Sequence, residues 1–344
     1  MSRYDMKLTR ITIRFPFAVL LAALVLAGCS KEPAPAPEPG GRVAVHFTLP
    51  GIEGKPEVAS AAEAPQTKAA LDEYATVRIV AYRHAAGTPS ADNYIAEQTY
   101  AADASGALSP CRVDGSGNFQ SFDASAALML PGGTYDFYAV TPALPLGNHT
   151  TVAVQHGVDY ATSVTDNGGA GFTFSLSDLP ASNVTLTTLQ RQCAKIELVV
   201  MRDASFAGMT SLVVNPQGSG VTLSSLSTSP LSAVVGAALT PTPSPLPAAK
   251  YNVAPARFTQ SDATTARTTV YVLPKVAADL GISFALKYTL NKVETNKTVS
   301  GKVSGIALDP GGSYRFTLTL SSPGATLTVT DWIDGGTQDN DMGA

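Results

Sequence analysis

The chain has 344 residues, of which 15% are charged and 44% are hydrophobic, and its formal net charge at pH 7 is −4. Without a basic stripe it is a poor candidate for nucleic acid binding, and its apolar content is too high for a disordered chain. About 300 residues follow the first 41, which is enough for two domains of ordinary size.

The first 28 residues have the pattern of a bacterial lipoprotein signal peptide. Basic residues precede an apolar run from Phe15 to Ala27, which is shorter than the ~20 residues that a membrane-spanning helix needs. Small residues then lead to Cys29, whose thiol would carry the lipid. We expect lipidation at Cys29 and a mature chain that begins there. The alternative is an ordinary signal peptide with an incidental cysteine.

Residues 29–41 continue as a proline-rich spacer. Alternating prolines favour polyproline II, which extends ~3.1 Å per residue, so the spacer would hold a folded body away from a membrane. Lys31 and Glu32 resemble the short charged signal that directs lipoproteins of Bacteroidota to the outer face of the outer membrane. We therefore expect an outer-membrane, surface-exposed protein.

The rest of the chain has the pattern of an all-β protein. Alternating apolar and polar residues predict short strands, which fall at 43–49, 76–82, 94–100, 126–130, 134–140, 150–154, 172–176, 184–189, 194–201, 268–273, 282–290, 298–308, 314–320 and 325–333. Polar loops are expected at 50–74 and 101–125, and one helical turn at 276–280. Residues 215–256, rich in Pro, Ser, Gly and Thr, are expected to form an extended surface excursion. Many short strands with turns between them indicate sandwiches or barrels.

One motif occurs twice. The segment from Pro131 to Phe137 reads PGGTYDF, and its counterpart at 310–316 reads PGGSYRF. Proline cannot donate to a sheet ladder and glycine adopts the positive φ of tight turns, so each copy predicts a turn into a strand. Two copies indicate two related β-domains in tandem; the alternative is a common turn repeated by chance. We place an N-terminal β-sandwich domain at 42–190 and a C-terminal one at 191–344.

The sequence offers no catalytic, cofactor-binding or metal-binding motif. The patterns HExxH, CxxC, GxSxG and the Walker loop are missing. His46 falls on the polar face of its expected strand, so we expect it on the surface. The cluster of Asp331, Asp334, Asp339 and Asp341 favours a solvated tail over a calcium loop, because the EF-hand spacing is not met. We expect no enzyme activity, no cofactor and no metal.

Two cysteines remain besides Cys29. Cys193 lies in an apolar strand pattern and Cys111 follows Pro110 in an expected loop. An exported chain can oxidise its thiols, but the sequence does not place these two near each other. We expect two free thiols, with a disulfide as the alternative.

Several segments resemble the fimbrillin-type lipoproteins of Bacteroidales, the type V pilins. These segments are the lipobox that ends at Cys29, Thr67-Lys68-Ala69 before a strand, the two Pro-Gly-Gly motifs, Ala194-Lys195-Ile196 and a late Trp332. They span most of residues 20–333. The resemblance implies two tandem transthyretin-like Greek-key β-sandwich domains, export as a lipoprotein and a structural role.

The resemblance also implies how the chain is processed and assembled. It implies loss of the N-terminal strand to a trypsin-like protease, which cuts the founding members of the family after an Arg. Here residues 43–77 contain no Arg, and Lys55 precedes a proline, so Lys68 is the matching residue. Trimmed subunits would then exchange strands. The expected donor is 325–333, with Leu327, Val329 and Ile333 on its apolar face; the alternative is that this strand completes its own sheet.

Two functions follow from these observations. The first is a subunit, shaft or tip, of a cell-surface fimbria that serves adhesion, with other fimbrial subunits, a processing protease and a host or bacterial surface ligand as partners. The second is a lipoprotein permanently anchored by Cys29 that binds glycans or host ligands. Exposed aromatic side chains would favour the second function, and the single Trp argues mildly against it. A mature N-terminus at Ala69 would favour the first. Shaft, tip and anchor roles stay open.

Overall fold

The computed structural model describes residues 41–53, 71–85, 89–103, 107–175, 181–214, 220–243, 246, 249–253, 258–321, 324–330 and 338–342. Within these ranges the chain is all β, which confirms the predicted fold class, and Ala204–Phe206 forms a single short 3₁₀ helix. No helix in the described ranges has the length and apolarity needed to cross a membrane. The signal peptide, Cys29, the spacer up to Gly40 and Lys68 lie outside the described residues.

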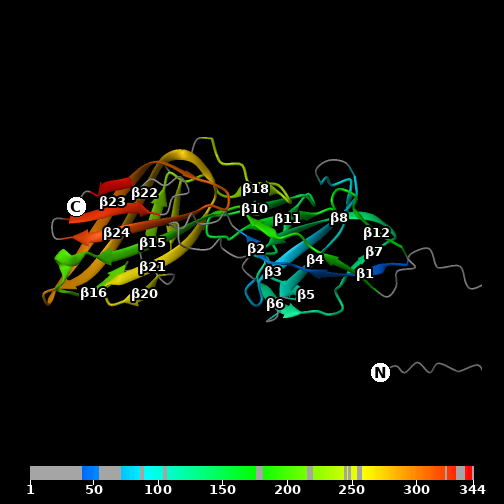
Figure 1. The fold of residues 1–344 in the computed structure, drawn as a ribbon, viewed down its shortest axis with the longest axis horizontal. Coiled ribbons are helices and arrows are strands. Elements are labelled where there is room, and N and C mark those ends of the chain that lie inside the picture. The colour runs from blue at the N-terminus through cyan, green and yellow to red at the C-terminus, as the bar shows by residue number, and fades with distance from the viewer. Residues whose placement is uncertain are drawn as a thin grey trace, which may run out of the picture. The chain divides into compact units, whose positions relative to one another are not determined.

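The strands of the first half precede residue 192. They are β1 (Val43–Thr48), β2 (Ile52–Glu53), β3 (Thr76–Arg83), β4 (Tyr94–Ala102), β5 (Leu108–Val113), β6 (Phe119–Phe122), β7 (Leu128–Leu130), β8 (Gly133–Thr141), β9 (Leu146–Gly147), β10 (Thr151–Val154), β11 (Ala161–Thr165), β12 (Phe172–Phe174), β13 (Ala181–Thr185) and β14 (Leu189–Arg191). One sheet has the order β2-β14-β11-β8-β3-β4-β5-β6, with β12 beside β8, and a small sheet has the order β13-β1-β7 (Figure 1). The faces of these two sheets enclose an apolar core around Phe47, Ile79 and Phe137.

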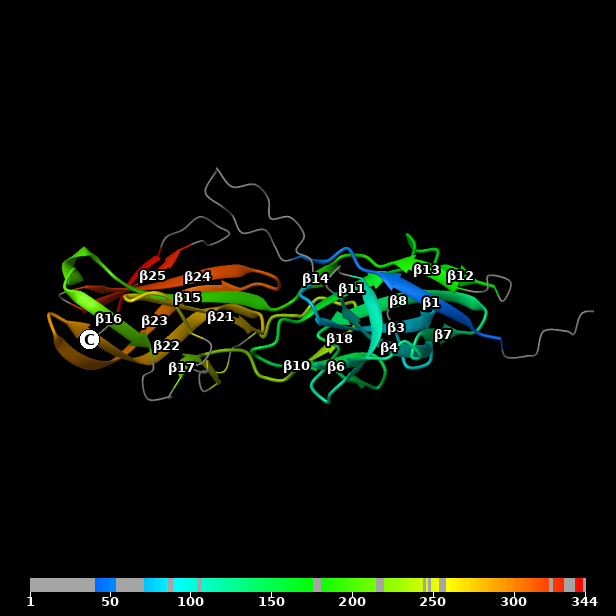
Figure 2. The same cartoon turned by 90° about the horizontal axis from the view of Figure 1, so that it is seen from below.

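The strands of the second half begin after Cys193. They are β15 (Ala194–Arg202), β16 (Met209–Val214), β17 (Val221–Ser224), β18 (Leu231–Val234), β19 (Lys250–Val253), β20 (Thr259–Asp262), β21 (Thr265–Val272), β22 (Lys275–Leu290), β23 (Val293–Leu308), β24 (Ser313–Ser321), β25 (Gly324–Thr330) and β26 (Gln338–Met342). One sheet has the order β20-β21-β15-β24-β25-β26, and the other joins β16, β22, β17 and β19, with β23 paired to β22 (Figure 2). Residues 276–280 lie in β22, so the predicted helical turn is wrong.

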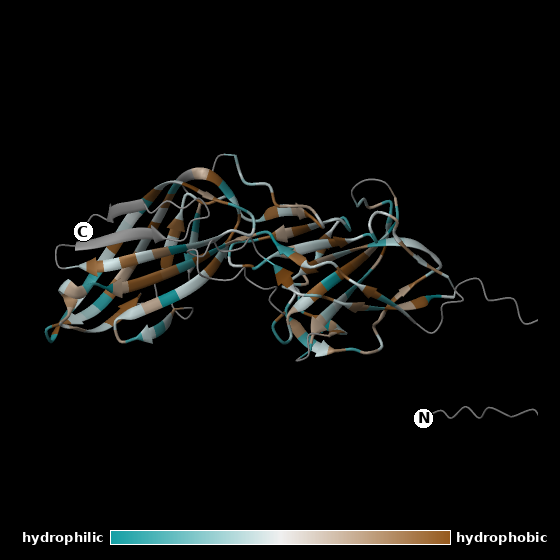
Figure 3. Cartoon of the chain, viewed as in Figure 1, coloured by the Kyte–Doolittle hydropathy of each residue, from teal (hydrophilic) through white to brown (hydrophobic). Residues whose placement is uncertain are grey.

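Alternation of buried and accessible residues explains why these strands form. In β15 every second residue from Ala194 to Val200 is buried, and in β24 the same holds for Tyr314 to Leu320. Figure 3 shows hydrophobic and hydrophilic colours alternating along the strands. The two strands pair in parallel, with Ile196 opposite Tyr314, so their buried residues face one core. A period of two gives each strand one apolar face, which the opposite sheet covers.

Residues 226–239 are not the surface excursion that their composition predicted. Strand β18 pairs antiparallel with β10, with Ala233 opposite Val152. Ala233, Val235 and Leu239 are buried in a third core cluster with first-half residues such as Tyr138. A segment of the second half therefore covers one face of the first-half sheet. The domain boundary at residue 191 stays a prediction.

Polar contacts reinforce this junction. Arg191 donates two hydrogen bonds to the Asp159 carboxylate, at 2.6 and 2.9 Å, and its guanidinium lies 5.5 Å from the ring centroid of Tyr271. His156 receives a hydrogen bond at Nδ1 from the backbone N–H of Leu273, at 3.1 Å. Its Nε2 lies 3.1 Å from the Ser227 carbonyl oxygen, to which it donates when the ring is neutral. The junction thus holds a histidine in one neutral tautomer.

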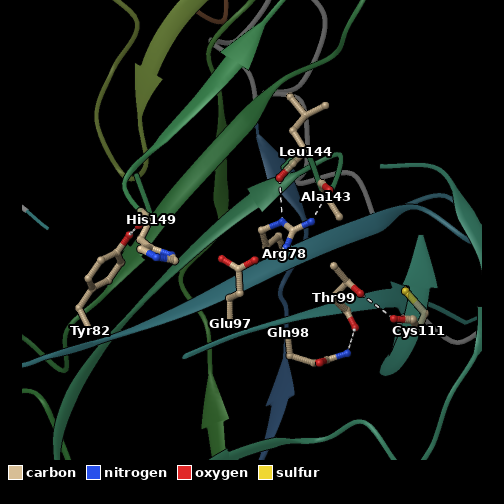
Figure 4. Close-up of polar contacts among 9 residues, drawn as sticks. All are labelled: Arg78, Tyr82, Glu97, Gln98, Thr99, Cys111, Ala143, Leu144 and His149. Carbon is tan, nitrogen blue, oxygen red and sulfur yellow. Dashed lines mark hydrogen bonds and ion pairs between the residues drawn. The ribbon is translucent and has the colours of Figure 1, made fainter. Parts of the chain in front are cut away.

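A second polar network ties β3 and β4 to the loop that follows β8 (Figure 4). Arg78 pairs with Glu97 at 2.5 Å and donates hydrogen bonds to the carbonyls of Leu144, at 2.7 Å, and Ala143, at 3.2 Å. The Tyr82 hydroxyl donates to the His149 carbonyl. These bonds satisfy backbone carbonyls that no strand partner reaches.

Both cysteines of the folded part are free and buried, which confirms that expectation. Cys111 lies in β5 and not in a loop. Burial raises the pKa of the Cys193 thiol to about 12, so this thiol is protonated and a poor nucleophile at neutral pH.

The two copies of the Pro-Gly-Gly motif share one feature of their local structure, a tyrosine packed over the second glycine. The Tyr135 hydroxyl donates to the Pro131 carbonyl at 2.8 Å, and the Tyr314 hydroxyl accepts from the backbone N–H of Asp309 at 2.7 Å. In each copy the tyrosine ring folds back over the second glycine. A Cβ placed on Gly312 would lie 2.5 Å from the Tyr314 hydroxyl oxygen. The strands that follow have different neighbours: β8 pairs antiparallel with β3, and β24 pairs parallel with β15.

We predict that Gly312→Val lowers the free energy of unfolding by about 2–3 kcal/mol, because the added carbons force the Tyr314 ring off its hydrogen bond. Gly115 is the matched control, since nothing lies within 4 Å of a Cβ placed there. Gly115→Val should change the same quantity by less than about 0.5 kcal/mol. Chemical denaturation followed by circular dichroism measures both. Equal effects of the two substitutions would contradict the role assigned to the tyrosine.

We also predict an acid-sensitive junction. Burial lowers the pKa of His156 below its ordinary 6.5. As the pH falls below about 6.5 the unfolded chain therefore binds a proton that the folded chain does not, and stability falls by up to about 1.4 kcal/mol per pH unit. The His156→Gln variant should lose this part of the pH dependence, and the exposed-site variant His46→Gln should keep it. Denaturation midpoints measured between pH 7 and 5 test this prediction. If the midpoints of wild type and His156→Gln fall in parallel as the pH is lowered, His156 does not cause the acid sensitivity.

Candidate functional site

The N-terminal strand β1 lies between two other strands of its sheet. It pairs in parallel with β13, from Ala44 opposite Ala181 to Thr48 opposite Thr185, and antiparallel with β7, where Val43 lies opposite Leu130. Both edges of β1 therefore use their backbone N–H and C=O groups. A strand that occurs first in the sequence thus occupies the centre of its small sheet.

One face of β1 belongs to the core. Val43, Val45 and Phe47 are buried, and the Phe47 ring packs edge-on against Tyr100, at a centroid distance of 5.5 Å, and Phe137, at 5.1 Å. His46 on the other face is exposed, which confirms the sequence expectation. The strand thus contributes three apolar side chains to the core of the first half.

The chain then crosses from the small sheet to the large one. The backbone N–H of Leu186 donates to the Thr48 carbonyl at 2.8 Å, and that of Leu189 to the Gly51 carbonyl at 3.0 Å. β2 then pairs in parallel with β14. A cavity of about 760 Å³ opens beside this edge, lined by Pro50 and Glu53 and by polar residues of the β11 and β14 region. The segment from Val43 to Glu53 is thus part of both sheets.

Removing residues 43–53 would uncover two strand edges and part of the core. The facing edges of β7 and β13 would expose unpaired backbone groups, and the core would open along a slot that Val43, Val45 and Phe47 now fill. Unpaired strand edges beside an apolar slot accept another extended strand. The arrangement can therefore receive a β-strand in place of β1.

A strand, β25 (Gly324–Thr330), covers most of the predicted donor segment 325–333, and its role as a donor stays a prediction. Leu327 and Val329 lie in β25, whereas Ile333 and Trp332 lie outside the described residues. β25 pairs antiparallel with β24, with Leu327 opposite Leu318, and with β26 on its other side. In this single chain, β25 and β26 are the last two strands of their sheet.

The structure gives no metal centre in the part of the chain that it describes. Among those residues, no three His, Cys, Asp or Glu side chains come together in a group suited to a metal ion. Asp339 and Asp341 lie in β26, and Asp331 and Asp334 lie outside the described residues.

Comparisons with known proteins show the family of the chain and relatives of its fold. A family model described as fimbrillin-like matches residues 42–334. A candidate cell adhesion protein from Bacteroides fragilis has a similar structure, with a TM-score of 0.64, 20% identity and coverage of 85% of this chain and 97% of that one. One from Bacteroides ovatus gives a TM-score of 0.50, 15% identity and coverage of 85% and 98%. The fimbrial anchor protein Mfa2 from Porphyromonas gingivalis gives a TM-score of 0.34 and 12% identity, with coverage of 85% of this chain and 98% of that one.

At 20% and 15% identity, the two Bacteroides structures share the fold of this chain. No curated protein matches the chain.

The packing of β1 leads to a stability prediction. Phe47→Ala should lower the free energy of unfolding by about 3–5 kcal/mol, because it leaves a cavity between Tyr100 and Phe137. His46→Ala, one residue away on the exposed face, should change it by less than about 0.5 kcal/mol. Urea denaturation of both variants measures the difference. A small effect at Phe47 would show that β1 contributes little to the core.

Proposed function

Because the chain belongs to the fimbrillin-like family, we propose that it is a structural subunit, in the shaft or at the tip, of a cell-surface fimbria that serves adhesion. The family suggests a structural rather than a catalytic protein, and association with other fimbrial subunits. The single observation that carries the proposal is the place of β1: a buried strand, paired on both edges, at the start of the folded chain.

The proposal includes export and trimming. The chain would leave the cell as a lipoprotein with its lipid on Cys29, reach the outer membrane, and be cut after Lys68 by a trypsin-like protease. Support for these steps comes from the sequence. The cut would separate β1 and β2, which end at Glu53, from β3, which begins at Thr76. The strand released is the one whose removal opens the slot between β7 and β13.

Assembly would follow by strand exchange. The segment 325–333 of one subunit would enter the slot of the next. β25 and β26 are the terminal strands of their sheet, so their departure leaves β24 paired with β15 on its other side. The core residues Phe316 and Leu318 of β24 would stay in place on that pairing. This topology supports β25 as a strand that can leave.

Three forms of the full precursor, expressed in cells that make the fimbria, test the proposal. We expect the wild type to be recovered with Ala69 as its first residue, in polymers that resist SDS without heating. The Lys68→Gln variant should keep its lipidated Cys29 and β1, and stay monomeric. A form without residues 325–344 should be trimmed at Ala69, folded and monomeric.

Two results would contradict the proposal. Polymers formed by Lys68→Gln would show that trimming at this residue is not needed. Unfolding of the second half in the form without residues 325–344, seen as loss of protease resistance, would show that β25 is indispensable to its own sheet. Lys55→Gln is the control for the cleavage site, because Lys55 precedes Pro56 and should not be cut.

A further inference from the structure

Three aromatic side chains form a cluster on the surface of the first half, which we call the aromatic platform: Tyr74, Phe119 and Phe122. The centroid of the Tyr74 ring lies 4.9 Å from that of Phe119 and 6.1 Å from that of Phe122, and the two Phe rings are 4.8 Å apart. Tyr74 is 47% exposed and Phe122 is 44% exposed. Clustered exposed rings of this kind mark interaction sites more often than single exposed apolar residues do.

Two departures from regular backbone bring the rings together. Residues three apart on a regular strand point to opposite faces, but the β5–β6 pairing shifts register at Gln120, between the pairs Arg112–Ser121 and Val113–Phe119. This bulge turns Phe119 and Phe122 to the same side. Tyr74 has a φ of 66°, which is uncommon for an aromatic residue, and its ring stacks on Phe119. Such backbone features occur frequently at functional sites.

Hydrogen bonds fix the backbone of the segments that carry the platform. The Asp114 carboxylate accepts hydrogen bonds from the backbone N–H groups of Ser116, at 2.8 Å, and Asn118, at 2.9 Å, and so fixes the turn before β6. Thr76 donates a hydrogen bond to the carbonyl of Gly117, inside this turn, at 2.5 Å. Thr99 of β4 donates to the Cys111 carbonyl of β5, at 2.6 Å (Figure 4). A preformed surface loses little entropy when it binds a ligand.

Polar groups lie next to the rings in the chain and on the opposite face of the β5–β6 pair. Asn118 and Gln120, on either side of Phe119 in the sequence, are exposed. Ser121 lies opposite Arg112, on the face away from Phe119 and Phe122. Arg112, 72% exposed, pairs with Asp123 at 2.9 Å. A hydrogen bond to the Glu73 carboxylate raises the pKa of Tyr74. The two segments that build the platform, 71–75 and 107–126, carry the carboxylates of Asp72, Glu73, Asp114 and Asp123 against the single cation of Arg112. This balance disfavours an anionic ligand.

We propose that the aromatic platform of Tyr74, Phe119 and Phe122 is a binding site for a neutral polysaccharide. The apolar C–H faces of pyranose rings would stack on the exposed aromatic faces. The Tyr74 hydroxyl, the Glu73 carboxylate bonded to it and the exposed amide of Gln120 would bind the sugar hydroxyls. A protein strand added at this edge fits less well, because β6 has four residues and a bulge, features that blunt a sheet edge. The proposal goes beyond the fimbrial role and does not depend on strand exchange.

Isothermal titration calorimetry of the full chain without its signal peptide, at neutral pH, tests the site. The probes are cellohexaose, mannohexaose and xylohexaose at millimolar concentration. We expect at least one to bind. Tyr74→Ala and Phe122→Ala should each weaken that binding by about tenfold or more, as removal of a single stacking ring does at other aromatic platforms. Val293→Ala, at a distant residue that is 64% exposed, should leave it unchanged.

Three results would overturn the proposal. The first is that none of the probes binds to the wild type. The second is binding that Tyr74→Ala and Phe122→Ala, both folded by circular dichroism, do not weaken. The third is a dimer in light scattering that Phe122→Ala dissociates, since the rings would then be an interface between copies of the chain. The assay uses unpolymerised protein, so its failure leaves the fimbrial proposal intact.

Discussion

The pairing of β1 is the constraint on which the first half of the molecule depends. A buried backbone N–H or C=O without a partner costs free energy, so a strand between two others can be absent only if something takes its place. β13 and β7 bond to opposite edges of β1, and Phe47 fills the core between Tyr100 and Phe137. Any replacement must therefore be an extended segment with apolar side chains at every second position.

Sequence periodicity located most strands because the two faces of each sheet meet different surroundings. β15 and β24 alternate cleanly, since one face of each meets the core, and β1 does so for the same reason. The candidate donor 325–333 was placed by the same signal, and β25 occupies most of it. Local alternation does not identify the partner of a strand. The parallel pairing of β1 with β13, more than a hundred residues later in the chain, was therefore beyond reach of the pattern.

The sequence predictions that the structure contradicts also have physical explanations. β6 was missed because its bulge at Gln120 breaks the period of two, so the segment read as a polar loop. This same irregularity creates the aromatic platform, whose sequence signal is only Phe119 and Phe122 three residues apart. The prediction for residues 226–239 is wrong because it rests on the composition of the longer segment 215–256, which is rich in proline and serine, and not on the apolar residues of 226–239 themselves. Their apolar residues Ala233 and Val235 have a core to enter only because β18 pairs with β10 in the other half.

The two proposed surfaces of the first half meet opposite physical requirements. The slot of β1 must be covered at all times, because exposed strand edges invite unspecific pairing. The aromatic platform must stay open, and it lies at the β6 edge of the large sheet, whereas β1 contacts that sheet only through the core and through β2 at its other edge. A subunit that changes its β1 partner can therefore keep the same platform, since no strand of the platform pairs with β1.

The covalent link through residues 54–70 explains why a cut would be needed for exchange. While β1 remains joined to β3, any donor strand must compete with it for the slot. The tether gives β1 an effective concentration at the slot that is higher than the concentration of a separate subunit. The parallel pairing of β2 with β14 adds a second attachment that an incoming strand must displace. Cleavage after Lys68 would remove the tether and break no backbone pair that β1 makes with β13 or β7. The strand would then belong to a separate fragment that no longer has this advantage, and a donor that is part of a folded subunit could replace it. Under the proposal, the protease would control when assembly begins, and the burial of Val43, Val45 and Phe47 would set how slowly β1 leaves the cut subunit.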